Sequence, residues 1–273
     1  MMEQGQGSGW EDVALPGAAT RAMEGGYRLW LHAPPAPSGR PLPVLWMLDG
    51  ASLFASVARA VSIISRRPDA TGVIPMAVVG IDHDPPDSAR RDADYSFGAC
   101  HDPAGLTHPA RFGGGQALLE RIKGPFRSAV ESRLPAVDLS RQVLLGHSLG
   151  GYFALNALAL QPGCIRVAGA ISPSIWWDAP AVQSALSAMP DAGQSLFLAA
   201  GEREEPSAIL TPAHERRAAR GIVREARTAA GIVEERLGKG RVKLTIAEDE
   251  DHASTFLAVL PAFLRFASRA LTR

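Results

Sequence analysis

The segment RQVLLGHSLGGYFALNALALQP, residues 141–162, decides the fold. An apolar run of strand length leads into the pattern Gly-x-Ser-x-Gly, and an apolar run of helix length follows it. A serine on a sharp turn between a strand and a helix has an exposed hydroxyl group, and the N-terminus of the helix favours negative charge beside it. Side chains at Gly146 and Gly150 are expected to collide with neighbouring backbone. We therefore predict that Ser148 is a nucleophile, the alternative being a glycine-rich turn with an incidental serine.

Strand-length apolar runs and helical patterns alternate along the rest of the chain. The apolar runs occupy residues 27–33, 43–48, 73–81, 142–146, 167–172, 195–200 and 242–248. The helical patterns occupy residues 51–65, 116–133, 152–160, 180–188, 212–237 and 255–271. Continuous apolar strands are typical of a parallel sheet that is covered on both faces. Together with the turn around the serine, this alternation predicts an α/β-hydrolase fold, with a mostly parallel sheet and helices on both faces.

The predicted organisation is a single domain over residues 13–273 that follows a flexible, Gly- and Gln-rich segment at 1–12. The proline-rich segment 33–43 suggests a hairpin between the first two apolar runs. The segment 83–115 is rich in Pro, Gly, Asp and Arg and follows a strand. Long loops in this position often line the site, so we expect this one to do so.

Composition excludes several classes of protein. The 273 residues carry 28 basic and 28 acidic side chains, so no overall charge attracts the chain to nucleic acid. Cys100 and Cys164 lie far apart and show no metal-binding spacing or disulfide framework. The N-terminus lacks the pattern of a secretory signal, and no apolar stretch is long enough to span a membrane. We expect a cytoplasmic enzyme, although a chain from which a signal had been removed would look the same.

The base that would activate the serine must follow it in the chain, because in this fold the order is serine, acid, histidine. Only His214 and His252 follow the serine. His214 opens a long polar helical pattern, whereas His252 lies on a loop after the last predicted strand. We predict that His252 is the general base.

The acid that orients the histidine should lie on the loop after the apolar run SLFLAA. This loop contains Glu202, Glu204 and Glu205 and no aspartate. We favour Glu204, with Glu202 as the next alternative. Carboxylates at 249–251 are closer to the histidine in sequence, but neighbouring loop positions seldom point back at the ring.

Two backbone N–H groups are expected to bind the oxygen on which negative charge develops. One belongs to Leu149, the residue after the predicted nucleophile. The other comes from the loop after an early strand, which reads Asp49-Gly50-Ala51. Alternatively, Asp49-Gly50 is an ordinary turn in which Asp49 caps the next helix.

Several segments together resemble the esterase family of α/β hydrolases that includes esterase D, the S-formylglutathione hydrolases and the mycolyltransferases. They are PVLWMLDG, RRDADYSF, GGGQALLERIKGPFRSAVESRL, VLLGHSLGGYFALNAL, AISPSIWWD, GEREE and EDEDHAST, in this order. The likeness is strongest to the ferric-enterobactin and salmochelin esterases and extends from about residue 27 to the C-terminus. GHSLGG is shared by many hydrolases, whereas SPSIWW together with LDG and DHAS is more specific.

The resemblance implies that Ser148 and His252 are the nucleophile and the base, and that Leu149 and Ala51 donate to the oxyanion. It also implies hydrolysis of the trilactone backbone of a catecholate siderophore, with no metal or organic cofactor of the enzyme's own. One departure is the alanine at 253, where the family has a DHGS-like turn.

A ferric tris-catecholate is a bulky, aromatic trianion, so its site should offer arginines and flat apolar surfaces. Arg90 and Arg91 on the long loop and Trp176 and Trp177 after a strand are the candidates, beside Asp49. The structural alternatives are an Arg91–Asp94 pair that braces the loop, and tryptophans that fill an edge of the core.

Three functions are therefore compatible with the sequence. The first is a serine esterase that hydrolyses a siderophore trilactone. The second is a general carboxylesterase or acyl-thioester hydrolase of the esterase D type. The third is an inactive hydrolase fold that serves as a binding module, which the intact Ser148 and His252 disfavour.

Overall fold

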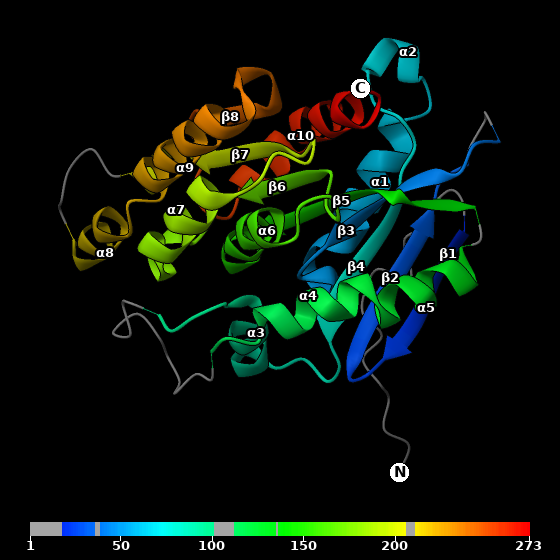
Figure 1. The fold of residues 1–273 in the computed structure, drawn as a ribbon, viewed down its shortest axis with the longest axis horizontal. Coiled ribbons are helices and arrows are strands. Elements are labelled where there is room, and N and C mark those ends of the chain that lie inside the picture. Colours follow the sequence, from blue (N-terminus) through cyan, green and yellow to red (C-terminus); the bar gives the residue numbers. More distant parts are fainter. Residues whose placement is uncertain (1–17, 36–38, 101–111, 135, 206–210) are drawn as a thin grey trace.

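The computed structural model describes residues 18–35, 39–100, 112–134, 136–205 and 211–273. Their strands form one eight-stranded sheet in the order β1-β2-β4-β3-β5-β6-β7-β8 (Figure 1). The segment that we expect to be flexible, 1–12, lies outside the described residues. No helix in the described segments is both long and apolar enough to cross a membrane.

The sheet is parallel from β4 onward and antiparallel at one edge. β1 pairs with β2, and β2 with β4, in antiparallel register, whereas every other neighbouring pair is parallel. The strands are β1 (Ala18–Glu24), β2 (Tyr27–Ala33), β3 (Leu42–Met47), β4 (Ala77–His83), β5 (Val137–His147), β6 (Val167–Ile171), β7 (Ser195–Gly201) and β8 (Val242–Ala247). This is the mostly parallel sheet that the sequence predicts.

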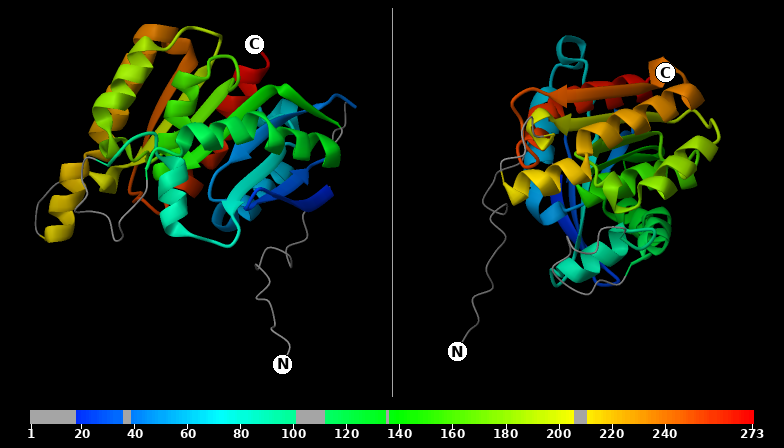
Figure 2. Two further views of the ribbon diagram at one scale, coloured as in Figure 1. Left: turned by 60° about the horizontal axis from the view of Figure 1, so that its bottom comes forward. Right: turned by 90° about the vertical axis from the view of Figure 1, so that its left-hand side faces the viewer.

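Helices cover both faces of the sheet (Figures 1 and 2). The larger helices are α1 (Gly50–Ile64), α3 (Ser88–Tyr95), α4 (Gly115–Lys123), α5 (Pro125–Arg133), α6 (Leu149–Leu160), α7 (Ala179–Ala188), α8 (Pro212–Arg220), α9 (Ile222–Leu237) and α10 (Thr255–Leu271). Shorter ones are α2 (Pro68–Thr71), η2 (Ile175–Trp177), η3 (Glu202–Glu204) and η4 (Lys239–Arg241).

Two apolar layers result, because successive strand residues point to opposite faces of the sheet. Within β5, Leu144 packs in the layer that contains α4, α5, α6, α7 and α9. Its neighbours Val143 and Leu145 pack in the layer that contains α1 and α10. All three side chains are buried, which explains why the central strands are apolar at every position.

The predicted hairpin at 33–43 is wrong, because β4 lies between β2 and β3 in the sheet. A hairpin is present instead at the antiparallel edge of the sheet, where Gly25 and Gly26 join β1 to β2. Both glycines have positive φ, 57° and 78°. A two-residue turn with two positive φ angles favours glycine and fits the twist of paired strands. The sequence therefore contained this signal.

Two predicted helices are each divided in the structure. The pattern at 116–133 forms α4 and α5, which meet at Gly124-Pro125, because proline lacks the N–H of a continuous helix and restricts the residue before it. The pattern at 212–237 forms α8 and α9, which meet at Gly221 with φ 54°. One predicted strand is also shorter at its start. The apolar run at 73–81 is expected to be a strand throughout, but β4 begins at Ala77, after Pro75.

The loops that follow four parallel strands meet at one edge of the sheet. Asp49 follows β3, Ser148 follows β5, Glu204 follows β7 and His252 follows β8. Ligands of open parallel sheets bind beyond the carboxyl ends of the strands, so this edge is the candidate site.

Candidate active site

The turn from β5 into α6 places Ser148 at a strained backbone position. Its φ is 57° and its ψ is −120°, a region that residues with a side chain rarely adopt. The turn is sharp enough that a Cβ atom on Gly146 would overlap the carbonyl group of Gly150. The sequence-based expectation for Gly146 therefore holds.

The same expectation is wrong for Gly150. A Cβ atom there would lie 3.4 Å from the Cβ atom of Leu48, which is an ordinary contact. It is the backbone of Gly150, at the start of α6, that comes close to Gly146, and only Gly146 must lack a side chain.

A chain of hydrogen bonds joins three of the predicted residues. The Oγ atom of Ser148 lies 3.1 Å from Nε2 of His252. The Nδ1 atom of the same ring lies 2.6 Å from Oε2 of Glu204. With the ring proton on Nδ1, that nitrogen donates to the carboxylate and Nε2 accepts from the serine hydroxyl.

Glu204 is fixed and ionised by its surroundings. Its side chain is buried at the end of η3, where Oε1 accepts from Ser172 Oγ at 2.5 Å and from the backbone N–H of Gly201 at 2.7 Å. Burial by itself would raise the pKa of Glu204, but the hydrogen bonds from His252, Ser172 and Gly201 outweigh it and lower the pKa. The carboxylate is therefore negatively charged at neutral pH.

The other two glutamates of this loop point elsewhere. Glu202 is exposed and accepts from the backbone N–H of Asp249, and Glu205 is exposed. Only Glu204 contacts the His252 ring among the three. His214 lies in the first turn of α8, where its backbone N–H donates to the hydroxyl of Thr211.

His147 supports the loop that carries His252, a role that the sequence analysis missed. Its Nε2 donates to the backbone carbonyl of His252 at 2.7 Å, and the two rings lie 4.7 Å apart. Burial and the neighbouring His252 ring lower the pKa of His147. His147 is therefore neutral at neutral pH and fixes the His252 loop as a hydrogen-bond donor.

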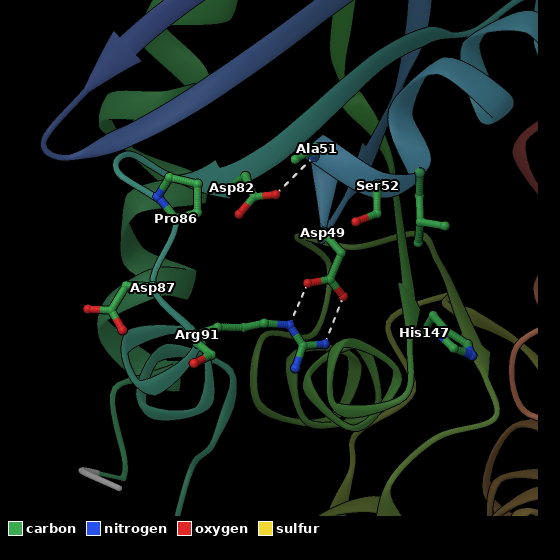
Figure 3. A pocket seen from close by; sticks show the side chains of 10 residues that line it. Asp49, Ala51, Ser52, Asp82, Pro86, Asp87, Arg91 and His147 are labelled. Carbon is green, nitrogen blue, oxygen red and sulfur yellow. Dashed lines mark hydrogen bonds and ion pairs between the residues drawn. The ribbon is translucent and has the colours of Figure 1, made fainter. Parts of the chain in front are cut away.

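The loop after β3 corrects the prediction for Ala51. Its backbone N–H donates to Oδ2 of Asp82 at 2.9 Å, so it is not free to bind a substrate oxygen (Figure 3). Asp49 donates its own N–H to the Tyr95 hydroxyl. The N–H groups of Gly50 and Leu149, each first in its helix, make no hydrogen bond with another described residue.

A pocket of about 290 Å³ opens at Ser148. Trp176, a predicted substrate contact, lines it. The pocket also contains three arginines that the sequence analysis missed, Arg203, Arg217 and Arg220. The guanidinium carbon of Arg220 lies 4.3 Å from the centre of the Trp176 ring. The spacing of Arg217 and Arg220 puts them on one side of a helix, a signal that was available in the sequence.

Two other predicted substrate contacts, Arg90 and Trp177, have partners within the protein. Arg90 donates to the carbonyl of Gly26 and packs over Tyr27, away from the pocket. Trp177 is buried and donates to the carbonyl of Gly98. Neither residue is among those that line the pocket at Ser148.

Arg91 forms a bidentate pair with Asp49, and not the expected pair with Asp94, whose carboxylate lies beside Arg90. Its Nε lies 2.5 Å from Oδ1 and its terminal nitrogen 2.8 Å from Oδ2 (Figure 3). Burial would lower the pKa of Arg91, but the bonds to Asp49 outweigh it and raise the pKa further. Both residues line a second pocket of about 430 Å³, with Asp82, Asp87 and His147 among the other residues. In the described residues, no cluster of His, Cys, Asp or Glu is arranged to hold a metal ion.

Comparisons with known proteins assign this chain to a family. A family model described as "Putative esterase" matches residues 20–238. The ferri-bacillibactin esterase BesA of Bacillus subtilis is 32% identical over 212 residues, which are 70% of this chain and 72% of that protein. The siderophore enterobactin esterase of Emericella nidulans is 31% identical over 253 residues, 85% of this chain and 84% of that protein.

Solved structures agree with this assignment. The siderophore hydrolase EstA from Aspergillus nidulans has a TM-score of 0.77 at 25% identity, over 92% of this chain and 94% of that chain. The BES protein from Bacillus cereus has a TM-score of 0.74 at 25% identity, over 98% of both chains.

These structures define the fold as that of an α/β hydrolase. The chain belongs to the esterase family, and it is an enzyme that hydrolyses ester bonds.

The contrast between the two glycines of the turn gives a matched pair of variants. We expect Gly146→Ala to lower the free energy of unfolding by about 3 kcal/mol or more, because backbone must move to admit the new methyl group. Gly150→Ala should change it by less than about 1 kcal/mol, since alanine is favourable in a helix. Urea unfolding followed by circular dichroism measures both. Equal destabilisation by the two substitutions would contradict this account of the turn.

Proposed function

We propose that this enzyme hydrolyses the ester bonds of a catecholate siderophore trilactone through an acyl-enzyme intermediate. The observation that carries the proposal is the pocket at Ser148, in which three arginines and Trp176 line the space beside the chain of hydrogen bonds. Relatives named as esterases of bacillibactin and enterobactin support the choice of substrate. A cytoplasmic location stays a prediction.

In the proposed mechanism His252 acts as the base in both steps, the formation and the hydrolysis of the acyl-enzyme. His252 takes the hydroxyl proton of Ser148 as the oxygen attacks the ester carbonyl, and then gives that proton to the leaving alcohol. Water, activated by the same ring, releases the acid and restores the serine. Glu204 stays ionised throughout and stabilises the imidazolium form of His252.

The developing oxyanion would be bound by the N–H of Leu149 and the N–H of Gly50. Leu149 begins α6, so its N–H lies at the positive end of the helix dipole. Gly50 takes the part that the sequence assigned to Ala51, because it is the residue of this turn whose N–H has no acceptor among the described residues.

The basic pocket accounts for an anionic substrate in a protein without net charge. Arg203, Arg217 and Arg220 line one pocket together with two carboxylates, Glu204 and Asp251, so positive charge is in excess there. The Arg220 guanidinium lies over the Trp176 ring, and the pair offers an aromatic anion a flat, positively charged surface. An uncharged acyl ester, the substrate of a general carboxylesterase, would have no use for these charges.

The first prediction concerns the nucleophile. Ser148→Ala should lower kcat for p-nitrophenyl acetate by about 10⁴-fold or more, because no acyl-enzyme can form. The variant should also fail to react with a fluorophosphonate probe, as measured by mass spectrometry of the intact protein. Retention of more than a few per cent of wild-type turnover in a contaminant-free preparation would refute the assignment.

The second prediction separates the glutamates. Glu204→Gln should lower kcat by about 10³- to 10⁴-fold, since an amide cannot stabilise the His252 imidazolium to the same degree. Glu202→Gln and Glu205→Gln are the matched controls and should stay within about 3-fold of wild type. Steady-state kinetics of all three variants are compared. An equal loss in either control would mean that Glu204 is not the acid.

The third prediction concerns the substrate. The wild-type enzyme should cut ferric enterobactin to linear fragments with a higher kcat/KM than p-nitrophenyl acetate. Arg217→Met should raise KM for the ferric trianion by about 3- to 10-fold at low salt and leave the uncharged ester unaffected. Arg216→Met, also exposed on α8 but outside the pocket, is the control.

Liquid chromatography with mass spectrometry follows the products of this reaction. Survival of both ferric and iron-free trilactones, while short acyl esters are hydrolysed, would replace this proposal with a general carboxylesterase. An equal effect of both arginine substitutions would show that Arg217 does not contact the substrate.

A further inference from the structure

The side chain of the residue that precedes α1 is held by groups outside this helix. Asp49 stands at the N-cap position with φ 57° and ψ 45°, in the left-handed region. An aspartate in this position usually accepts a hydrogen bond from the helix, but this side chain makes no such bond. Its carboxylate is directed to Arg91 instead. The capping role considered from the sequence is therefore not the role of Asp49.

Donors of this turn are bound by other elements. The N–H of Asp49 is held by the Tyr95 hydroxyl, and the N–H of Ala51 by the Asp82 carboxylate. Tyr95 and Arg91 both belong to α3, and the Arg91 guanidinium packs 4.9 Å from the centre of the Tyr95 ring. One short helix thus holds Asp49 through its backbone and its side chain, and the N–H of Gly50 has no acceptor among the described residues.

Helix α3 is itself anchored firmly enough to act as a support. The Asp94 carboxylate accepts from the Tyr27 hydroxyl at 2.6 Å and lies 2.9 Å from Nε2 of His83. Arg90, the neighbour of Arg91, is bonded to the carbonyl of Gly26 in the β1–β2 hairpin. The helix is therefore tied to the antiparallel edge of the sheet.

The negative charge of Asp49 requires a positively charged partner, and Arg91 is that partner. Its Oδ2 would lie 3.6 Å from a Cβ atom on Gly150, the second residue of α6, so the carboxylate stands beside the first turn of α6. An unpaired negative charge there would oppose the negative charge that develops on the substrate oxygen bound by Leu149. The Arg91 fork neutralises Asp49 with two parallel hydrogen bonds.

We propose that Arg91 is a positioning residue, which holds Asp49 in its left-handed conformation and neutralises its carboxylate so that the Gly50 and Leu149 N–H groups can bind the oxyanion. The inference rests on the proposed function in that it assumes an oxyanion mechanism at Ser148. It gives Arg91 a role in the rate of acyl transfer, whereas the sequence suggested a role in substrate binding.

The test uses p-nitrophenyl acetate, which is small, uncharged and independent of the siderophore. Arg91→Met should lower kcat by about 10- to 100-fold and change KM by less than about 3-fold. The reason is that the oxyanion of the transition state loses more stabilisation than the bound substrate does. The rate of labelling by a fluorophosphonate should fall in parallel. Arg127→Met, an exposed arginine on α5, is the control and should retain wild-type kinetics.

A second substitution separates positioning from loss of folding. Asp49→Asn removes the charge and keeps a side chain that tolerates the left-handed conformation. The double variant Asp49→Asn/Arg91→Met should therefore recover kcat to within about 5-fold of wild type, although it has lost the same arginine. A general loss of structure would not be reversed by a second substitution.

Three results would overturn the proposal. They are a kcat of Arg91→Met within 2-fold of wild type, a double variant no faster than Arg91→Met, and an effect confined to KM for ferric enterobactin. The last would make Arg91 a substrate contact. If the wild type fails to cut the siderophore while these kinetics hold, the proposed substrate is wrong and the positioning role stands.

Discussion

The close approach of Gly146 to the carbonyl group of Gly150 is the contact on which the rest of the site depends. It lets β5 end and α6 begin with a single residue between them. That residue, Ser148, is therefore raised above the edge of the sheet, and the N–H of Leu149 comes to the first position of a helix. A bulkier turn would move both groups away from the loops after β7 and β8. The local absence of one methyl group thus fixes the relative position of the groups that we propose to be catalytic.

Much of the site could be predicted because its determinants are local. The elbow is defined by residues that are consecutive in the chain, and the loop of His252 is identified by its place after the last apolar strand. The choice among the three glutamates was only a preference, since nothing local separates them. Residues 202–204 form a single turn of 3-10 helix, so their side chains point in different directions. Contact with Ser172 and His252, which are distant in sequence, selects Glu204.

Pairs of adjacent residues show where the sequence was insufficient. Arg90 and Arg91 differ by about 100° in direction around α3, so one reaches the hairpin and the other reaches Asp49. Trp176 and Trp177 are divided in the same way between the pocket and the core. Two adjacent arginines in a sequence can both lie near a site, but the direction in which each points from the helix decides which of them faces it. In contrast, the breaks at Pro125 and Gly221 were local signals that the long helical patterns obscured.

The two pockets carry opposite charge, and they are lined by the consecutive residues His147 and Ser148. One holds Arg203, Arg217 and Arg220 against two carboxylates, Glu204 and Asp251. The other holds three aspartates, at 49, 82 and 87, with Arg91 bound to the first. The whole chain carries no formal net charge, so it has no overall charge with which to attract an anion from a distance. At short range the two pockets favour one orientation, because an anionic group gains energy beside the arginines and loses it beside the aspartates. For the anionic substrate that we propose, charge would therefore act mainly on which ester bond faces Ser148, and the rate would depend on how well the Gly50 and Leu149 N–H groups are held.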